Sequence, residues 1–447
     1  MPKVILENPR KSVAESTMKY MLDGIRYVCA TFTKRKPGSQ SERNAQAYFK
    51  TELEGYADNV VMEDFSLHPD AFMGFIPIAA VFILAGVACF WLGKGSLIVA
   101  ILGALLPLLS TLMFLFEFLF YRSFVDFLFP KKISRNVYAT RKPSGEVKQR
   151  IIFGGHTDAA YEWTYSYLGE VAGLAFAIFT AVASMIVGLV ANLVRLVYVI
   201  AEHVTLTSQQ IKDLTAIGQD PFKLQGGWLG WGIALLCTIP FGLIICKFIN
   251  YKIVVDGAND NLTANYISMS ILKEMAEADM RFEHTEVGCL LSGSEEAGLR
   301  GAKAFAKKHQ KEFSKADSGV ETIFIALDTM REIDEMRVCN FGCTGTMSND
   351  RAVGDLLHAA GEACGVKLPD SELYPGAVDA EAFSMFGLRS TGFTAVSHEA
   401  RRYYHTRQDT ADNVDSECMA LSFNICKEAA RIFDEQGMAQ FDAARAK

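Results

Sequence analysis

The sequence is poor in charged residues. Asp, Glu, Lys and Arg make up 21% of its 447 residues, whereas apolar residues make up 50% and the mean hydropathy is +0.15; an ordinary soluble domain has about 25% charged residues. The 44 basic and 51 acidic residues give a formal net charge of −7, so no nucleic-acid partner is expected. The composition excludes disordered and fibrous chains and indicates that part of the protein is not in water.

Paired cysteines and a signal peptide are also missing. The ten cysteines show no short paired spacing, and the first residues lack the apolar core and cleavage site of a secretory signal. The sequence contains no internal repeat and no low-complexity tract. We therefore expect reduced cysteines that face a cytosol-like compartment.

The apolar residues are concentrated in four runs, each at least 20 residues long and free of charged side chains. The runs cover residues 71–93, 97–116, 171–194 and 224–246. Such a run is long enough to span a bilayer, whereas the alternative, a buried core helix, usually has an apolar run of about 10 to 14 residues. We expect a multi-pass membrane protein with four transmembrane helices, inserted as two hairpins.

Basic residues near the apolar runs predict the orientation. An even number of crossings places residues 1–70, 130–165 and 251–447 on one side of the membrane. Six basic residues lie near the ends that enter this side: Arg122, Lys131, Lys132, Arg135, Lys247 and Lys252. Four lie in the opposite loops: Lys94, Arg195, Lys212 and Lys223. Because basic residues favour the cytoplasmic side, the soluble part is expected to be cytoplasmic.

The soluble part alternates between strand and helix patterns, which favours an α/β sheet with helices on its faces. Apolar residues recur every three or four positions in 267–275 and 421–432, as in helices that pack on a sheet. The expected strands are 150–153, 287–291, 322–327, 337–341 and 391–396, with a further one at 60–66.

Histidine and acidic residues follow directly after three of these strands. His156 follows RIIFGG, Glu295 and Glu296 follow VGCLLSGS, and Asp328 follows TIFIAL. In open α/β sheets the ligand crevice lies outside the carboxyl ends of the strands. These side chains are therefore expected to converge.

Each motif, taken alone, also has a purely structural explanation. His156 and Asp158 are two residues apart, so in an extended chain they point the same way and Asp158 can orient the imidazole, but a turn with a hydrogen-bonded histidine explains them equally. The GANDN segment around Asp260 is typical of a turn before a helix. Ser292 and Glu295 have capping-box spacing, and YHTRQDT is compatible with a capped surface loop.

Together, the motifs supply what a two-metal hydrolase needs: two histidines, three acidic ligands and one further carboxylate. Two divalent cations about 3.5 to 4 Å apart require a bridging carboxylate, which Asp260 is expected to provide. Imidazole with carboxylate suits zinc and also accepts cobalt or manganese. We expect two divalent metal ions, with Zn²⁺ the best fit, and Glu295 as the group that relays a proton from metal-bound water.

These motifs resemble those of the co-catalytic zinc aminopeptidases of metallopeptidase family 28. That family's motifs run His-x-Asp, Gly-x-Asn-Asp-Asn, Glu-Glu-x-Gly-Leu, Leu-Asp and Tyr-His-Thr-x-x-Asp-Thr, and this chain has HTD, GANDN, EEAGL, LD and YHTRQDT in that order. The RKPGS segment at 35–39 is similar to the family's Arg-x-x-Gly-Ser, and Asp379 and Phe383 to its late Asp-x-x-x-Phe element. The resemblance covers essentially the whole soluble part.

The resemblance implies a mixed, mostly parallel sheet sandwiched by helices and a role for each site residue. Glu295 would be the general base, and Asp158 would orient one imidazole. The metal ligands would form two sets that share one residue: Asp260, Glu296 and His405 for one ion, and Asp260, Asp328 and His156 for the other.

The chain departs from the family pattern in its length between motifs, because both apolar hairpins interrupt the hydrolase. The expected organisation is an N-terminal part of the catalytic domain at 1–70, a transmembrane hairpin at 71–130, the first metal-ligand segment at 131–165, a second hairpin at 166–250 and the catalytic core at 251–447. The metal site is then expected to lie close to the bilayer and to act on membrane-associated or strongly apolar peptides.

The expected activity is that of a membrane-anchored aminopeptidase, which removes the N-terminal residue of a peptide by means of metal-bound hydroxide. One alternative is another reaction of the same clan, such as carboxypeptidase, amide deacylase or glutaminyl cyclase chemistry; cyclases resemble single-metal variants. The other alternative is a catalytically silent membrane scaffold or receptor. Such proteins typically lose ligands or the base, and none is missing here.

Overall fold

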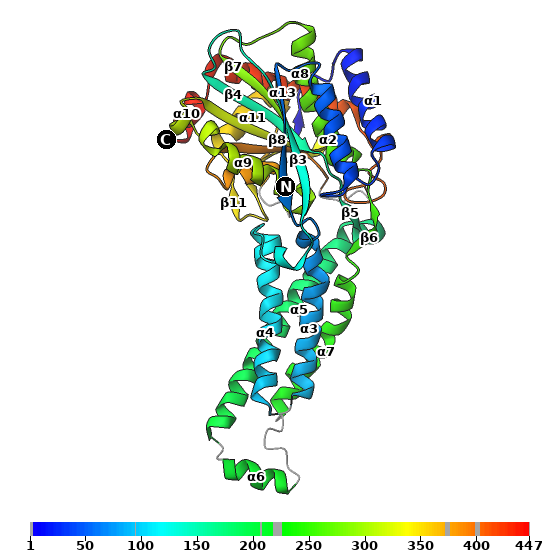
Figure 1. The fold of residues 1–447 in the computed structure, drawn as a ribbon, viewed down its shortest axis with the longest axis vertical. Coiled ribbons are helices and arrows are strands. Elements are labelled where there is room, and N and C mark those ends of the chain that lie inside the picture. The colour runs from blue at the N-terminus through cyan, green and yellow to red at the C-terminus, as the bar shows by residue number, and fades with distance from the viewer. Residues whose placement is uncertain are drawn as a thin grey trace.

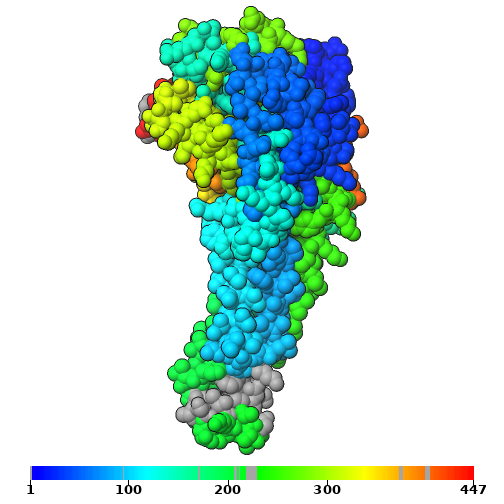
Figure 2. All heavy atoms as spheres, in the orientation of Figure 1, coloured from blue at the N-terminus to red at the C-terminus, as the bar shows by residue number. Residues whose placement is uncertain are grey.

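The structure, a computed structural model, describes residues 3–93, 95–205, 208–217, 226–371, 376–397 and 403–446. A globular part carries both ends of the chain, and long helices extend from it as a stalk (Figure 1). Figure 2 shows the same elongated outline with the side chains in place. Lys94 and Lys223, which contribute to the predicted orientation, lie outside the described residues.

A seven-stranded mixed sheet forms the centre of the globular part, in the order β2-β3-β7-β4-β8-β13-β9. The four central strands β7, β4, β8 and β13 are parallel to one another. β3 is antiparallel to both of its neighbours, and β9 is antiparallel to β13. The strand bounds are Asn59–Leu67 (β2), Lys132–Arg141 (β3), Gln149–His156 (β4), Thr285–Ser292 (β7), Glu321–Met330 (β8), Arg337–Cys339 (β9) and Arg389–Ala395 (β13).

Helices cover both faces of this sheet. Successive strand residues point to opposite faces, so Ile151 and Phe153 join the core on one side while Ile152 joins the core on the other. The first face packs against Glu15–Thr31 (α1), Gln40–Leu53 (α2), Thr263–Glu277 (α8), Arg351–Ala363 (α11) and Ser416–Gln436 (α13). The second packs against Arg300–Phe313 (α9) and Asp379–Ser384 (α12). The expected mixed sheet between helices is confirmed.

Short elements complete the globular part. β1 pairs with β12 and β10 with β11, both antiparallel. No disulfide joins any of the ten cysteines. The remaining bounds are Ile5–Leu6 (β1), Phe341–Gly342 (β10), Met347–Ser348 (β11), Val366–Lys367 (β12), Lys315–Ser318 (α10) and Ala439–Arg445 (α14).

The strands expected from the sequence are present, with one division, and the central sheet has one strand that was not expected. The segment expected as a single strand at 337–341 divides into β9 and β10, because it turns away from the sheet after Cys339. β3 was not predicted. Its buried Asn136 interrupts the apolar pattern, and the structure compensates this polar side chain with hydrogen bonds to Gly301 O and from Gly293 N, each 3.0 Å long.

The four apolar runs form the stalk helices: Ala71–Leu92 (α3), Leu97–Met113 (α4), which continues as Phe114–Leu119 (η1), Thr164–Thr205 (α5) and Gly226–Ile245 (α7). Three of them, α3, α4 with η1, and α5, are long and apolar enough to cross a membrane. The expectation of four such helices is therefore not fully met. The apolar part of α7, Leu229–Ile245, is shorter, and the start of the predicted run at Leu224 lies outside the described residues.

The third run is longer than expected. α5 has 42 residues and is therefore about 63 Å long, roughly twice the hydrocarbon thickness of a bilayer. It continues past Arg195, whose guanidinium lies over the ring of Phe90 at 5.1 Å. The separate helix Ser208–Ala216 (α6) lies at the far end of the stalk (Figure 1).

A two-stranded antiparallel ribbon joins the stalk to the globular part. Tyr161–Trp163 (β5) leads directly into α5, and Ile249–Val254 (β6) follows α7. α5 therefore starts from this ribbon, and the chain returns to the same ribbon after α7. This ribbon lies beside the YHTRQDT segment, where the Trp163 backbone N–H donates to the carbonyl of His405 at 2.8 Å.

Candidate metal centre

Three parallel strands deliver their polar residues to one edge of the sheet. β4 ends at His156, β7 ends at Ser292 just before Glu295 and Glu296, and Asp328 lies near the end of β8. The carboxyl ends of parallel neighbours meet at the same edge. The side chains predicted to converge therefore do lie together.

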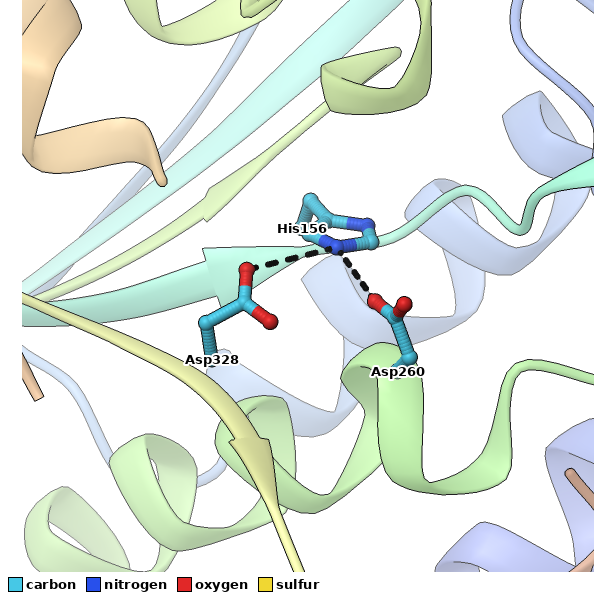
Figure 3. A group of neighbouring side chains, drawn as sticks. All are labelled: His156, Asp260 and Asp328. Carbon is cyan, nitrogen blue, oxygen red and sulfur yellow. Dashed lines mark hydrogen bonds and ion pairs between the residues drawn. The ribbon is translucent and has the colours of Figure 1, made fainter. Parts of the chain in front are cut away.

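Asp260 lies between the two histidines. One carboxylate oxygen, Oδ1, is 3.0 Å from His156 Nε2, and the other, Oδ2, is 3.0 Å from His405 Nε2. Asp328 approaches the same nitrogen of His156, with Oδ2 at 3.8 Å from Nε2 (Figure 3). Glu296 Oε1 is 3.3 Å from His405 Nε2. Each oxygen of Asp260 thus faces a separate His–carboxylate pair.

The described residues contain three groups whose ligand atoms lie close enough together to hold an ion. Two of them coincide with the ligand sets that the family resemblance implies: His156, Asp260 and Asp328, and Asp260, Glu296 and His405. The third consists of His156, Glu295 and Glu296. All of these residues come from the expected set.

Asp158 fastens the end of β4 to the turn that carries the two glutamates. Its carboxylate accepts hydrogen bonds from the backbone N–H groups of Glu295 and Glu296, both at 3.0 Å. Its Oδ1 also lies 3.4 Å from Nδ1 of His156. The carboxylate therefore positions the glutamate turn as well as facing the imidazole, and sequence spacing predicts only the second of these contacts.

The loop around Asp260 is fixed from two sides. Asp409 accepts hydrogen bonds from the backbone N–H of Asn259 at 2.7 Å and of Asp260 at 3.2 Å. The fully buried Arg35 donates to the carbonyl of Asp256 at 2.6 Å. Gly257 has a φ of 62°, in the left-handed region that favours glycine. The RKPGS and YHTRQDT segments thus hold Asp260 in place.

Sequence reasoning missed Glu42, which supports the glutamate turn. This fully buried side chain accepts hydrogen bonds from the backbone N–H of Gly38 and from the N–H and hydroxyl of Ser294, at 2.7, 2.7 and 2.8 Å. Burial raises the pKa of Glu42 to about 8. The sequence shows only that Glu42 lies near the start of a helix. Glutamate is common at such positions, so this does not single out Glu42 as a functional residue.

The charge distribution of the cluster follows from its burial. Burial, with the charge of Asp260, raises the pKa of Asp328 to about 7. Burial raises the pKa of Glu296 to about 8 and that of Glu295 well above its usual range. Burial alone would lower the pKa of His156, but hydrogen bonds to neighbouring carboxylates raise it above its usual range. The cluster holds more potential negative charge than its imidazoles balance.

The donor set fits divalent cations. Glu296 Oε1 is buried and makes no hydrogen bond to the described residues; its charged neighbour is His405, whose Nε2 lies 3.3 Å away. A buried carboxylate oxygen needs a hydrogen bond or a positive partner, and a cation between Asp260, Glu296 and His405 would supply one. Imidazole nitrogen with carboxylate oxygen is the ligand combination that zinc accepts.

Residues 247–430 match the family model of peptidase family M28. This match confirms the resemblance that the motifs show. The match begins after the second insertion and contains four of the five motifs, from GANDN to YHTRQDT. The family match and the fold support a hydrolase whose globular part is interrupted by helices. No curated protein matches the chain.

Several solved structures share the fold of this chain. An aminopeptidase from Aneurinibacillus sp. strain AM-1 is 14% identical with a TM-score of 0.52, and the match covers 95% of this chain and 94% of that chain. BSAP, a zinc aminopeptidase from Bacillus subtilis, is 11% identical with a TM-score of 0.50 and coverages of 93% and 94%. A glutaminyl cyclase from an Acidobacteriales bacterium is 11% identical with a TM-score of 0.50 and coverages of 95% and 97%.

The inserted segments form part of the wall around the candidate metal centre. A pocket of about 40 Å³ contains Asp260, Glu295 and His405, and among its other walls are Phe72, Met73, Phe118, Tyr121 and Trp163. The ring of Trp163 lies 4.3 Å from that of His405, centroid to centroid. These aromatic residues belong to the stalk helices and their connections. The insertions thus shape the space that a substrate would enter.

Proposed function

We propose that the chain is a membrane-anchored aminopeptidase that hydrolyses the N-terminal peptide bond of peptides. The enzyme would use two divalent metal ions, for which Zn²⁺ is the best fit. One observation carries this proposal: the two oxygens of Asp260 each face a different histidine at 3.0 Å. A carboxylate shared by two imidazole–carboxylate pairs is what a two-metal hydrolase requires.

The positions of the site residues support a separate role for the metal ligands and for Asp158. Asp260, Glu296 and His405 would hold one ion, and Asp260, Asp328 and His156 the other. When bound, the ions supply Lewis acidity and lower the pKa of water. Asp158 holds the glutamate turn through two backbone N–H groups.

Glu295 is the proposed general base. Its Oε2 lies 3.9 Å from His156 Nε2, and the side chain lines the pocket beside Asp260 and Asp328. The carboxylate takes a proton from the attacking water and returns it to the leaving amine.

The proposed membrane anchor rests on the surface of the stalk. In the most apolar stretch of each long helix, only 33–44% of residues are buried. The outward residues include large apolar side chains: Val81, Ile98, Phe179, Ile186 and Val197. A soluble protein rarely exposes so large an apolar surface to water, and a bilayer would cover it. The basic residues at the helix ends favour a cytoplasmic globular part.

A substrate panel tests the reaction. We expect detergent-purified protein to release the N-terminal residue of aminoacyl amides with a free amine, and to lose this activity with a chelator and regain it with zinc. Substrates with an acetylated amine are the matched control, and we expect at least about 10²-fold lower rates for them. Equal hydrolysis of both sets would indicate a deacylase. Cyclisation of N-terminal glutamine without hydrolysis would indicate a cyclase.

Cysteine labelling tests the orientation. Lys212 is exposed on α6 at the far end of the stalk, and Lys307 is exposed on α9 in the globular part. With a membrane-impermeant thiol reagent, we expect Lys212→Cys to react in intact cells and Lys307→Cys to react only after permeabilisation. The unsubstituted chain sets the background. The reverse pattern would place the catalytic part outside the cytoplasm.

A further inference from the structure

A second cavity lies between the stalk helices, beside the pocket of the metal centre. Its volume is about 140 Å³, and α3, α4 with η1, α5 and α7 all line it. Three aromatic residues, Phe118, Trp163 and Tyr404, line both this cavity and the metal-centre pocket. The two spaces therefore adjoin at one aromatic wall.

We propose that this cavity, which we name the stalk cavity, binds a linear hydrocarbon chain of the substrate, about six carbon atoms long, while the amide of the same substrate lies at the metal centre. The inference rests on the proposed peptidase function and adds a substrate class to it. The substrates would be amides or peptides that carry an alkyl chain close to the cleaved bond.

The size and shape of the stalk cavity fit such a chain. Its 140 Å³ is close to the volume of about 150 Å³ at which an apolar protein cavity binds benzene, a six-carbon molecule. The lining residues extend from Phe75 to Ile83 on α3, a distance of about 12 Å along the helix. On α5 they extend from Leu174 to Met185, about 16 Å. A cavity of this volume that follows the helices over such distances is longer than it is wide.

The lining favours hydrocarbon over peptide. Among the described lining residues of the four helices, the polar side chains are Ser110 and Ser184. The hydroxyl of Ser184 already donates to the carbonyl of Thr180 at 2.7 Å. A peptide segment brings one N–H and one C=O per residue, and a buried amide without a partner costs free energy. An alkyl chain brings no such groups.

A hydrocarbon chain in the stalk cavity could come from two sources, a substrate or the acyl tail of a membrane lipid. The position of the stalk cavity favours the substrate. The ring of Trp163, which separates the two spaces, lies 4.3 Å from the ring of His405, a proposed ligand. A chain that passes this wall is therefore held next to the reacting amide, where binding energy can orient the substrate.

Two series of free-amine substrates test the proposal with the full-length protein in lipid nanodiscs. The first consists of leucine amides of ethyl-, butyl-, hexyl- and decylamine, and the second of anilides of 2-amino acids with alkyl side chains of the same lengths. In at least one series we expect kcat/KM to rise about fourfold per methylene. The rise should end at about six carbons, where the cavity is full.

A pair of alanines on α5 provides the variants. Ala181 lines the stalk cavity, whereas Ala175 is exposed on the outside of the stalk. A phenyl ring at position 181 fits the empty volume, so we expect Ala181→Phe to reduce the hexyl-to-ethyl ratio of kcat/KM to near one. Ala175→Phe should keep the ratio of the unsubstituted protein. Ala79→Phe, which fills the same cavity from α3, is a second blocking variant.

The possible results separate this inference from the proposed function. A hexyl-to-ethyl ratio near one in the unsubstituted protein, or an unchanged ratio in both blocking variants, would overturn the proposal and leave the peptidase intact. A rate that depends on the acyl length of the nanodisc lipid alone would also overturn it and assign the cavity to a lipid tail. If no amide is hydrolysed, the peptidase proposal fails. Chain binding can then still be tested by the melting temperature of the protein. Leucine hexylamide should raise it more than leucine ethylamide does, and this difference should be lost in Ala181→Phe.

Discussion

The Glu295→Gln variant is expected to lose about 10²–10⁴-fold in kcat while it keeps its metal content. Gln has the shape of Glu but cannot accept the proton of the attacking water. Glu295 belongs to neither of the two ligand sets that share Asp260, so the ions should remain bound. Single-turnover rates on a free-amine aminoacyl amide, together with the metal-to-protein ratio from elemental analysis, measure both quantities on one preparation.

The neighbouring Glu296→Gln variant is the control for this experiment. Its Oε1 lies 3.3 Å from His405 Nε2, and we assign it to an ion, so this substitution should lower the metal content as well as the rate. The two variants differ by a single position on the same turn. If Glu295→Gln keeps more than about a tenth of the wild-type kcat, or if it also loses an ion, Glu295 is not the general base.

Several site residues could be predicted from the sequence because each of them lies near or just after the end of a strand. A short apolar run followed by His156, by Glu295 and Glu296, or by Asp328 marks the carboxyl end of a strand, and parallel strands bring such ends together. The fold class follows from the same alternation of strands and helices. No long-range contact needs to be known for these steps.

The contacts that support the site could not be predicted because they join segments that are far apart in the sequence. Glu42 accepts hydrogen bonds from Ser294, 252 residues further along the chain. Asp158 reaches the backbone of Glu295 across 137 residues. A buried carboxylate on a helix and a carboxylate after a histidine have many explanations, and only the assembled fold identifies the partner. β3 was missed for a related reason, since buried Asn136 is compensated by residues of other elements.

The insertions were visible as apolar runs, but their relation to the site was not. Phe72 and Phe118 belong to the first insertion and Trp163 to the ribbon that starts the second, and all three line the metal-centre pocket. Sequence analysis predicts that the site lies near the bilayer. The structure adds that the stalk contributes the walls of the pocket, so an M28 peptidase without these insertions would enclose its substrate differently.

The Asp260→Asn variant is expected to lose both ions and to reduce activity about 10³-fold or more. Each oxygen of Asp260 faces a different histidine at 3.0 Å, and an amide is neutral and offers only one oxygen. In Asp328→Asn and Glu296→Gln one complete ligand set remains, so these variants should each retain about one ion. Elemental analysis after dialysis, with circular dichroism to verify folding, compares the three. If Asp260→Asn retains as much metal as the single-set variants, Asp260 does not bridge the two ions.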